Sequence, residues 1–330
     1  MEFRKLIAFG KGSFIISLPK KWTEKHNLTK GHLIGVEETS DGLIISAKTS
    51  DTKAKKKSIT IPAENKSIPL LTSEIISAYL GNADTIEVLS NDLQKNALTI
   101  KNTLRNLAGM EVMEQTATKL VAKYLIDKKE ISIPLIIRRM DNITRAMAQD
   151  VLQFFDKKQD VENIAQRDTD VNRLHFLAYR EIRAAIIDPR LANSLQMSQL
   201  DLHTSKHIVQ RIERIADCQK EIARSVDQIN LQKKSLDRLK SLYGSINGHY
   251  SNVMKSYYTK DINLSYKIEL GIVDLFDKCD SLLDDHVHSN TSSNKIPKGR
   301  LHQVSLSHIV GFLKIMVTNI RYIARSILDG

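Results

Sequence analysis

Hydrophobic and polar positions divide the chain into three segments with different periods. In the first fifty residues, short apolar runs such as "RKLIAF", "SFIISL", "HLIGVEE" and "GLIISAK" alternate with glycine turns. These runs predict paired strands, and "PKKWTEKHNL" between them predicts a short helix that begins at a proline. From residue 131 onward, apolar residues recur every three or four positions, which predicts long helices. The expected helices cover residues 131–158, 160–187, 199–229, 231–258, 261–286 and 300–328.

The segment between these two regions mixes both periods. "SITIP" and "DTIEVLS" have strand patterns, while "LLTSEIISAYLG" and "DLQKNALTIKNTLRNLAG" have helical ones, and "MEVMEQTATKLVAKYLI" predicts two further strands. The sequence therefore predicts a multidomain α+β protein. We expect a β domain at 1–50, a small α+β module at 58–130, and tandem all-α three-helix bundles at 131–229 and 230–330.

The stretch "GKGSFIISLPKKW" shows what the first domain requires. Its glycines lie between two strand patterns and lack the GxxxxGK[ST] spacing of a phosphate-binding loop, so they predict a hairpin turn. "SFIISLP" is too apolar for a strand that stays exposed, and a unit of about fifty residues cannot bury it alone. A second copy of the chain is the simplest partner that could bury this strand, so we expect a homodimer through this domain.

The order and spacing of these elements over about 45 residues resemble the SpoVT-AbrB family of swapped-hairpin DNA-binding domains. The matching features are the paired strands, the ending Leu18-Pro19-Lys20, the helix with Trp22 and the "LTKGHLIGV" turn and strand. The resemblance implies an interlocked dimer that binds DNA. By position, it implies DNA contacts by Arg4, Lys5, Lys11, Ser13, Lys20 and Lys21.

The distribution of charge agrees with an anionic partner. The net charge of the chain is +11, and residues 1–66 carry +6 of it. A concentrated basic segment favours nucleic acid or an acidic membrane surface as partner, although a solvated lysine surface would give the same composition.

Carboxylates in the helical segment lie where an exposed face would not place them. On a helical projection centred on Ile164, Asp168 lies about 40° from the apolar centre, and Asn172 lies one turn further on. In "IVQRIERIADCQKEIARSV", Glu213 and Asp217 are also one turn apart at the margin of an apolar stripe. Two such helices could bring four oxygen-bearing groups together, as in metal sites of helical bundles. Salt bridges with Arg173 or Arg214 are the alternative.

These segments resemble the PhoU family of phosphate-signalling regulators, over roughly residues 131–330. "IERIADCQKEIA" and "RDTDVNRLHFL" carry the resemblance, with Asn172 where the family usually has Asp. The resemblance implies iron or zinc at one site, formed by Asp168, Asn172, Glu213 and Asp217. In the second bundle, "FLKIMVTNIRYIARSIL" places Lys314 and Thr318 at the motif positions, and no site is expected there.

Composition excludes several classes of protein. We find no apolar run long enough to span a membrane and no secretory leader, and the two cysteines indicate a reducing compartment, so we expect a cytoplasmic protein without membrane insertion. No nucleophile elbow, HExxH, phosphate-binding loop or dinucleotide fingerprint occurs, so we do not expect an enzyme.

The combined resemblance implies a DNA-binding transcriptional regulator of phosphate uptake and homeostasis with a metal-binding sensor region. Its expected partners are DNA, a second copy of the chain, and components of a phosphate transporter or its signalling kinase. The alternative is an adaptor that regulates a phosphate transporter by protein contact, in which the N-terminal domain only dimerises the chain.

Overall fold

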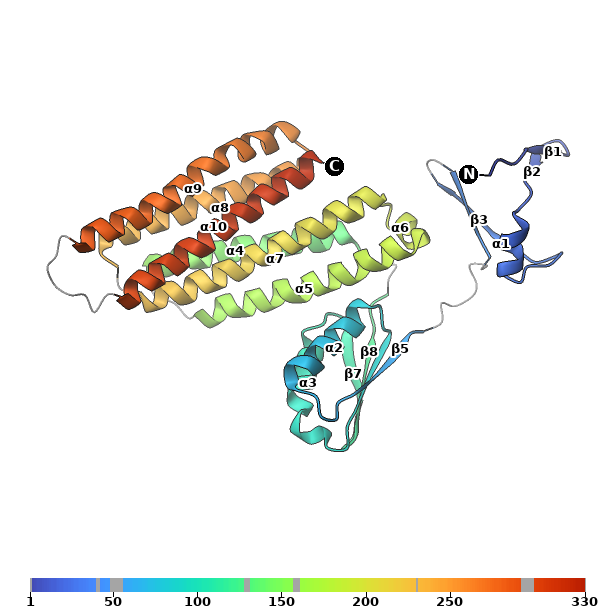
Figure 1. Cartoon of the computed structure of the whole chain (residues 1–330), viewed down its shortest axis with the longest axis horizontal. Coiled ribbons are helices and arrows are strands. Elements are labelled where there is room, and N and C mark those ends of the chain that lie inside the picture. The colour runs from blue at the N-terminus through green and yellow to red at the C-terminus, as the bar shows by residue number, and fades with distance from the viewer. Residues whose placement is uncertain are drawn as a thin grey trace. The chain divides into compact units, whose positions relative to one another are not determined.

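The computed structural model describes residues 2–39, 42–47, 56–127, 131–156, 161–229, 231–291 and 300–329 (Figure 1). The chain forms two compact units, Met1–Lys56 and Lys57–Gly330. We describe each of them separately.

The first unit contains two separate antiparallel strand pairs and a short helix. Its elements are β1 (Ile7–Phe9), β2 (Ser13–Ile15), α1 (Lys20–Lys25), β3 (Gly35–Thr39) and β4 (Gly42–Ser46). Strand β1 pairs with β2, and β3 pairs with β4. The chain reverses between β1 and β2 at Gly10, whose φ of 67° is a left-handed conformation that suits glycine. The strands are shorter than the apolar runs that predict them.

The described residues of this first unit do not form a buried hydrophobic core. No side chain whose burial is described in it is buried, and Trp22 of α1 is only half-buried. Large apolar side chains on its strands and loops are exposed, among them Phe9 at 65%, Phe14 at 68% and Leu33 at 78%. These exposed apolar side chains are available for contact with a second copy, and the expected homodimer stays a prediction. The strand exchange of a swapped hairpin involves a second chain, and it stays a prediction.

The second unit begins with a four-stranded sheet. Its elements are β5 (Ser58–Pro62), α2 (Ile68–Leu80), β6 (Thr85–Leu89), the 3-10 turn η1 (Leu93–Lys95), α3 (Ala97–Arg105), β7 (Met110–Gln115) and β8 (Lys119–Tyr124). The strand order is β5-β6-β8-β7, with β5 and β6 parallel and the other pairs antiparallel. Helices α2 and α3 pack against the sheet and enclose a core that includes Ile75, Ile86 and Leu104. This arrangement follows the predicted alternation of strands and helices.

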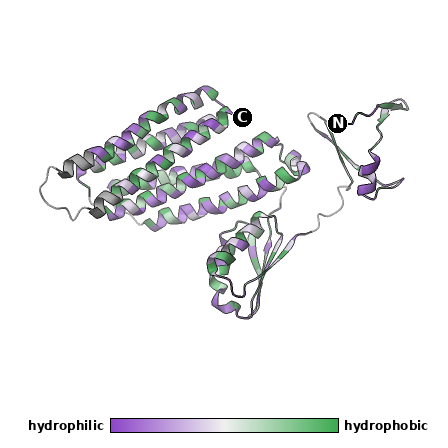
Figure 2. Cartoon of the chain, in the orientation of Figure 1, coloured by the Kyte–Doolittle hydropathy of each residue, from purple (hydrophilic) through white to green (hydrophobic). Residues whose placement is uncertain are grey.

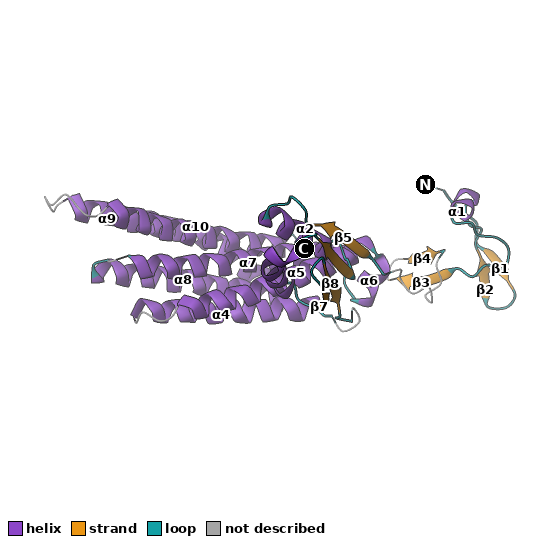
Figure 3. Cartoon of the chain, turned by 90° about the horizontal axis from the view of Figure 1, so that it is seen from below, coloured by secondary structure: helices purple, strands orange, loops and turns teal. Residues whose placement is uncertain are grey.

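Long helices make up the rest of the unit. They are α4 (Ile133–Asp156), α5 (Val161–Ile187), α7 (Gln199–Gln228), α8 (Lys233–Thr259), α9 (Ile262–Thr291) and α10 (Arg300–Leu328), together with the short α6 (Pro189–Ser194). They run alongside one another (Figure 3), with apolar and polar residues interleaved along each (Figure 2). A capping box starts α7: Ser198 Oγ accepts from the Asp201 N–H, and the Asp201 side chain accepts from the Ser198 N–H.

The six long helices share one continuous hydrophobic core. Helix α7 packs against α4 and α5 and also against α10, while α8 packs against α9, α10 and α4. Buried residues of all six belong to a single cluster, which includes both cysteines, Cys218 and Cys279. The chain reverses between α7 and α8, close to the predicted domain boundary at 229/230, but the core continues across that boundary.

A buried arginine joins the sheet module to the helices. Arg180 of α5 is fully buried, and its Nη1 donates to the backbone oxygen of Tyr79 at 2.6 Å. Its guanidinium also lies over the rings of Tyr124, at 3.9 Å, and Tyr79, at 4.8 Å. The Tyr124 hydroxyl in turn donates to Glu181 Oε1 at 2.9 Å. The module from 57 to 127 is thus connected to α5 through a desolvated charge and two aromatic rings.

A carboxylate and lysine cluster as the candidate functional site

The four predicted site residues come from two adjacent helices. Asp168 and Asn172 lie one turn apart on α5, and Glu213 and Asp217 lie one turn apart on α7, which packs against α5. The amide Nδ2 of Asn172 donates to Asp168 Oδ2 at 3.2 Å. The Asp168–Asn172 pair and the Glu213–Asp217 pair therefore lie on two helices that pack against each other, and their role as metal ligands stays a prediction.

Lys220 lies at the centre of this cluster, and the sequence analysis missed it. Its Nζ donates to Asp168 Oδ2 at 2.6 Å and to Asp217 Oδ1 at 2.9 Å. The ammonium therefore bridges α5 and α7. The sequence does indicate that Lys220 can reach Asp217, because the two residues are three positions apart and lie on the same side of the helix.

Burial and charge shift the pKa values of the cluster. Asp168 is 4% exposed, and this burial raises the pKa of its carboxyl, although the ammonium of Lys220 opposes the shift. Burial alone would lower the pKa of Lys220, but its hydrogen bonds to Asp168 and Asp217 outweigh that effect and raise it. Burial, reinforced by Asp217 and Asp168, raises the pKa of Glu213 to about 7. Glu213 therefore binds its proton up to a higher pH than an exposed glutamate does.

A cavity of about 670 Å³ opens beside Glu213. Side chains from α5, α7 and α10 line it, together with Leu80 of α2. His175, on the α5 side, is largely buried, which lowers the pKa of its imidazole to about 4, and its Nε2 has no hydrogen-bond partner among the described residues. The cavity provides solvent with a path to the edge of the cluster.

The predicted alternative, a salt bridge with Arg214, is also present. Arg214 Nη1 lies 3.8 Å from Asp217 Oδ2, at the exposed side of the cluster. Arg173, the other arginine considered, forms no ion pair with the cluster within the described part of the chain. Asp217 is therefore flanked by two cations, a close ammonium and a more distant guanidinium.

The arrangement does not fit a metal site. Within the described ranges, no three His, Cys, Asp or Glu side chains lie close enough together to hold a metal ion. The oxygens of Asp168 and Asp217 that face each other already accept hydrogen bonds from Lys220. Asp168 Oδ1 remains buried without a hydrogen-bond partner in the described structure. Binding of iron or zinc stays a prediction that measurement has to decide.

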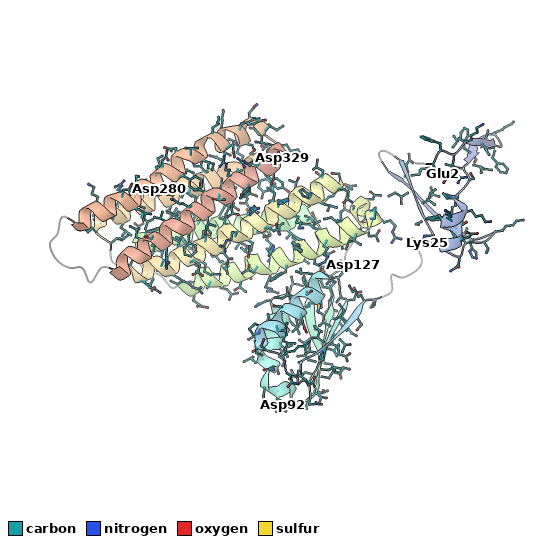
Figure 4. All side chains as sticks on the ribbon, viewed as in Figure 1. Glu2, Lys25, Asp92, Asp127, Asp280 and Asp329 are labelled. Carbon is teal, nitrogen blue, oxygen red and sulfur yellow. The ribbon has the colours of Figure 1, made fainter. Side chains whose placement is uncertain are left out.

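The corresponding positions of α10 carry another lysine. Lys314 Nζ donates to Oδ1 of Asp280, which lies on α9 (labelled in Figure 4), at 2.5 Å. Thr318 donates its hydroxyl to the backbone oxygen of Lys314 at 2.8 Å. Both residues named from the motif are therefore engaged in contacts within the helices.

The predicted DNA-binding residues lie in the first unit. All six are exposed: Arg4, Lys5, Lys11, Ser13, Lys20 and Lys21. Arg4 pairs with Glu2 and lies 3.5 Å from the Ser17 hydroxyl, while Lys20 is 3.8 Å from Glu24. Lys11 occupies the turn between β1 and β2, and Lys20 and Lys21 begin α1. These positions are accessible to a polyanion, and DNA binding stays a prediction.

The described residues between 131 and 329 form a bundle of long helices with buried ion pairs, and this fold does not by itself specify an activity. Comparison with known families matches residues 137–226, from α4 to the end of α7, to the family described as PhoU domain. The matched stretch contains the whole carboxylate and lysine cluster.

Two further comparisons concern solved structures and curated protein sequences. A solved structure, the phosphate transport system regulatory protein PhoU from Streptococcus pneumoniae, is 16% identical, with a TM-score of 0.45, covering 60% of this chain and 95% of that one. No curated protein sequence matches the chain. None of the described helices is long and apolar enough to cross a membrane.

Proposed function

We propose that this protein regulates phosphate transport by contact with a component of the transporter or of its signalling system. The PhoU domain at residues 137–226 is the observation that carries the proposal. The resemblance of "IERIADCQKEIA" and "RDTDVNRLHFL" in the first helical half to phosphate-signalling regulators supports it. This is the adaptor alternative of the sequence analysis, and it requires neither DNA nor chemistry at the cluster.

A surface suited to such a contact lies on α9. Tyr266, Leu270 and Val273 follow one another at helical spacing and are 55%, 79% and 61% exposed. We name these three residues the α9 stripe. Large apolar side chains at this spacing are the usual anchors when helices dock against a partner. The α9 stripe therefore supports the proposal that the helical region acts by contact with a partner protein.

DNA binding by the first unit is the second candidate, because basic residues are concentrated there. Residues 1–66 carry +6 of the net charge, and the six predicted contact residues are exposed. In this candidate, a homodimer of the first unit would hold an operator through phosphate contacts. The helical region would then sense the partner and change the occupancy of the operator.

One experiment separates the two candidates. In host cells that lack the protein, uptake of labelled phosphate is measured at low and high external phosphate, with variants supplied in its place. The α9 variant is Leu270→Ser with Val273→Ser. The three-lysine variant is Lys11→Ala, Lys20→Ala and Lys21→Ala. The adaptor mode predicts that control of uptake fails with the α9 variant and persists with the three-lysine variant.

Matched controls remove general effects of each change. The control for loss of surface hydrophobicity is Leu135→Ser with Ile187→Ser, because both residues are exposed and lie elsewhere on the helices. Exposed lysines of the second unit, Lys234, Lys255 and Lys267, replaced by Ala, control for loss of charge. Failure of the three-lysine variant alone would favour the DNA-binding candidate. Unchanged uptake in cells without the protein would overturn both.

A further inference from the structure

A lysine ammonium lies between two carboxylates at the position where the motif of the helices predicts a metal ion. Its distances of 2.6 Å to Asp168 and 2.9 Å to Asp217 are those of charge-assisted hydrogen bonds. The two carboxylates belong to different helices, so a cation between them connects α5 to α7. We infer that Lys220 is the resident cation of this cluster and that its ammonium excludes a divalent metal ion from it.

The tether of the lysine explains why the ammonium prevails over a dissolved ion. Lys220 is on the same helix as Asp217, three residues further on, so its ammonium is held beside the carboxylates at a high effective concentration. A metal ion would need the same oxygen lone pairs, and it would have to displace a positive charge that cannot leave the site. Asn172 adds to this, because it donates to Asp168 Oδ2 and presents no negative charge.

The balance of charge predicts what happens when the lysine is removed. Two carboxylates face one ammonium, and Asp168 Oδ1 is buried without a hydrogen-bond partner among the described residues. Without the ammonium, two negative oxygens on adjacent helices would share a space the size of the lost side chain. Carboxylate oxygens that converge without a cation of their own bind hard and borderline divalent ions. The cavity beside Glu213 offers these ions a route to the cluster.

The second helical half repeats the device with different residues. Lys314 of α10 pairs with Asp280 of α9 at 2.5 Å, so a lysine again bridges two helices through a carboxylate. This second pair is independent of the first, because it lies on other helices. One of these lysines, Lys314, is at a motif position and the other, Lys220, is three residues after one, and each connects two helices through a carboxylate.

Elemental analysis of the full-length chain tests the inference. Wild type, Lys220→Ala and Lys240→Ala are each incubated with Zn²⁺ or Mn²⁺, passed through a desalting column and analysed. Lys240 is the matched control, since its ammonium bridges α8 to Asp156 of α4 at 2.6 Å but lies at a more exposed position. Each protein is also melted with and without EDTA, and circular dichroism at low temperature confirms that it is helical.

We expect wild type and Lys240→Ala to retain almost no metal and to melt at the same temperature with or without EDTA. Lys220→Ala should retain about one ion per chain, melt at a lower temperature in EDTA and recover when metal is added. Adding Asp217→Asn to Lys220→Ala should abolish the retention. If Lys220→Ala does not fold, Lys220→Gln replaces it, since the amide occupies similar space without the charge.

Two results would overturn the inference. The first is about one ion per wild-type chain that is lost on replacement of Asp168 or Asp217 by Asn, which would make the cluster a metal site despite the lysine. The second is a folded Lys220 variant that gains no metal, which would show that the ammonium is not what excludes it.

Discussion

Replacement of Arg180 by Met should destabilise the second unit more than any exposed charge substitution. Met retains much of the aliphatic volume but removes the guanidinium, which donates to Tyr79 O and covers the rings of Tyr79 and Tyr124. It also removes the cation 3.6 Å from the buried carboxylate of Glu181, which keeps its hydrogen bond from the Tyr124 hydroxyl.

The magnitude follows from the burial of the group. Loss of one partner from a buried charged arrangement typically costs about 3–5 kcal/mol. Glu181 keeps one donor, and Met is cheaper to bury than a guanidinium, so we expect the lower end, about 3 kcal/mol. For a folded unit of this size, such a loss corresponds to a melting temperature lower by roughly 6–12 °C.

Chemical denaturation of the full-length chain, followed by far-ultraviolet circular dichroism, measures this change. Arg183→Met is the matched control, because Arg183 lies on the same helix and is exposed, and we expect it to cost less than about 0.5 kcal/mol. Hydrogen exchange in Arg180→Met should also rise first in α2 and β8, the elements that the arginine connects to α5. A cost of less than about 1 kcal/mol for Arg180→Met would show that the buried charge does not hold the module to the helices.

Four further predictions concern titration, assembly and DNA. Burial raises the pKa of the Glu213 carboxyl to about 7, so the folded chain keeps this proton as the pH rises from about 4.5 to 7, while the unfolded chain releases it. The free energy of unfolding therefore falls across this pH window. Glu213→Gln should recover about 1–2 kcal/mol of this free energy at pH 8, as measured by denaturant titration. Burial lowers the pKa of the His175 imidazole to about 4, so the free energy of unfolding has the opposite dependence here and decreases as the pH falls from about 6.5 to 4. If the pH profile of stability for His175→Phe matches that of wild type, this prediction is wrong. A fragment of residues 1–50 should sediment as a dimer and unfold at a midpoint that rises with protein concentration, whereas a stable folded monomer would refute dimerisation by the first unit. If the first unit binds DNA, log K should fall with log salt by about 0.9 per phosphate neutralised, and the three-lysine variant should bind more weakly with a flatter slope in fluorescence anisotropy.

The sequence predicted the helical region well because each long helix has a strong apolar stripe. The observed helices begin and end within a few residues of the predicted ranges, except that α9 extends to Thr291. Periodicity tells which face of a helix is buried but not which helix covers it, so the continuous core through α7 and α10 was not predicted. The six-residue α6 was also missed, since its Asp188 cap and Pro189 resemble a simple break between helices.

The candidate site was predicted in part for a related reason. Asp168, Asn172, Glu213 and Asp217 stood out because oxygen-bearing groups lay near apolar stripes. Lys220 did not, because a lysine at the margin of a helix is normally a solvated charge. Only the rotation of α5 against α7 determines that its ammonium reaches Asp168, 52 residues away in the sequence. Long-range pairing of this kind is not encoded in the local pattern.

The absence of a core in the first unit has a consequence for biosynthesis. Residues 1–56 are made ahead of residues 57–330, whose synthesis takes roughly 15–55 s at ordinary ribosomal rates. During that time, side chains such as Phe9, Phe14 and Leu33 remain exposed among the described residues of their own unit. Neighbouring ribosomes on one messenger carry the same segment at high local concentration, so the nearest cover is another nascent copy. Pairing during translation would protect these strands from chaperones and proteases, and it would make the yield of protein depend on how densely the messenger is translated.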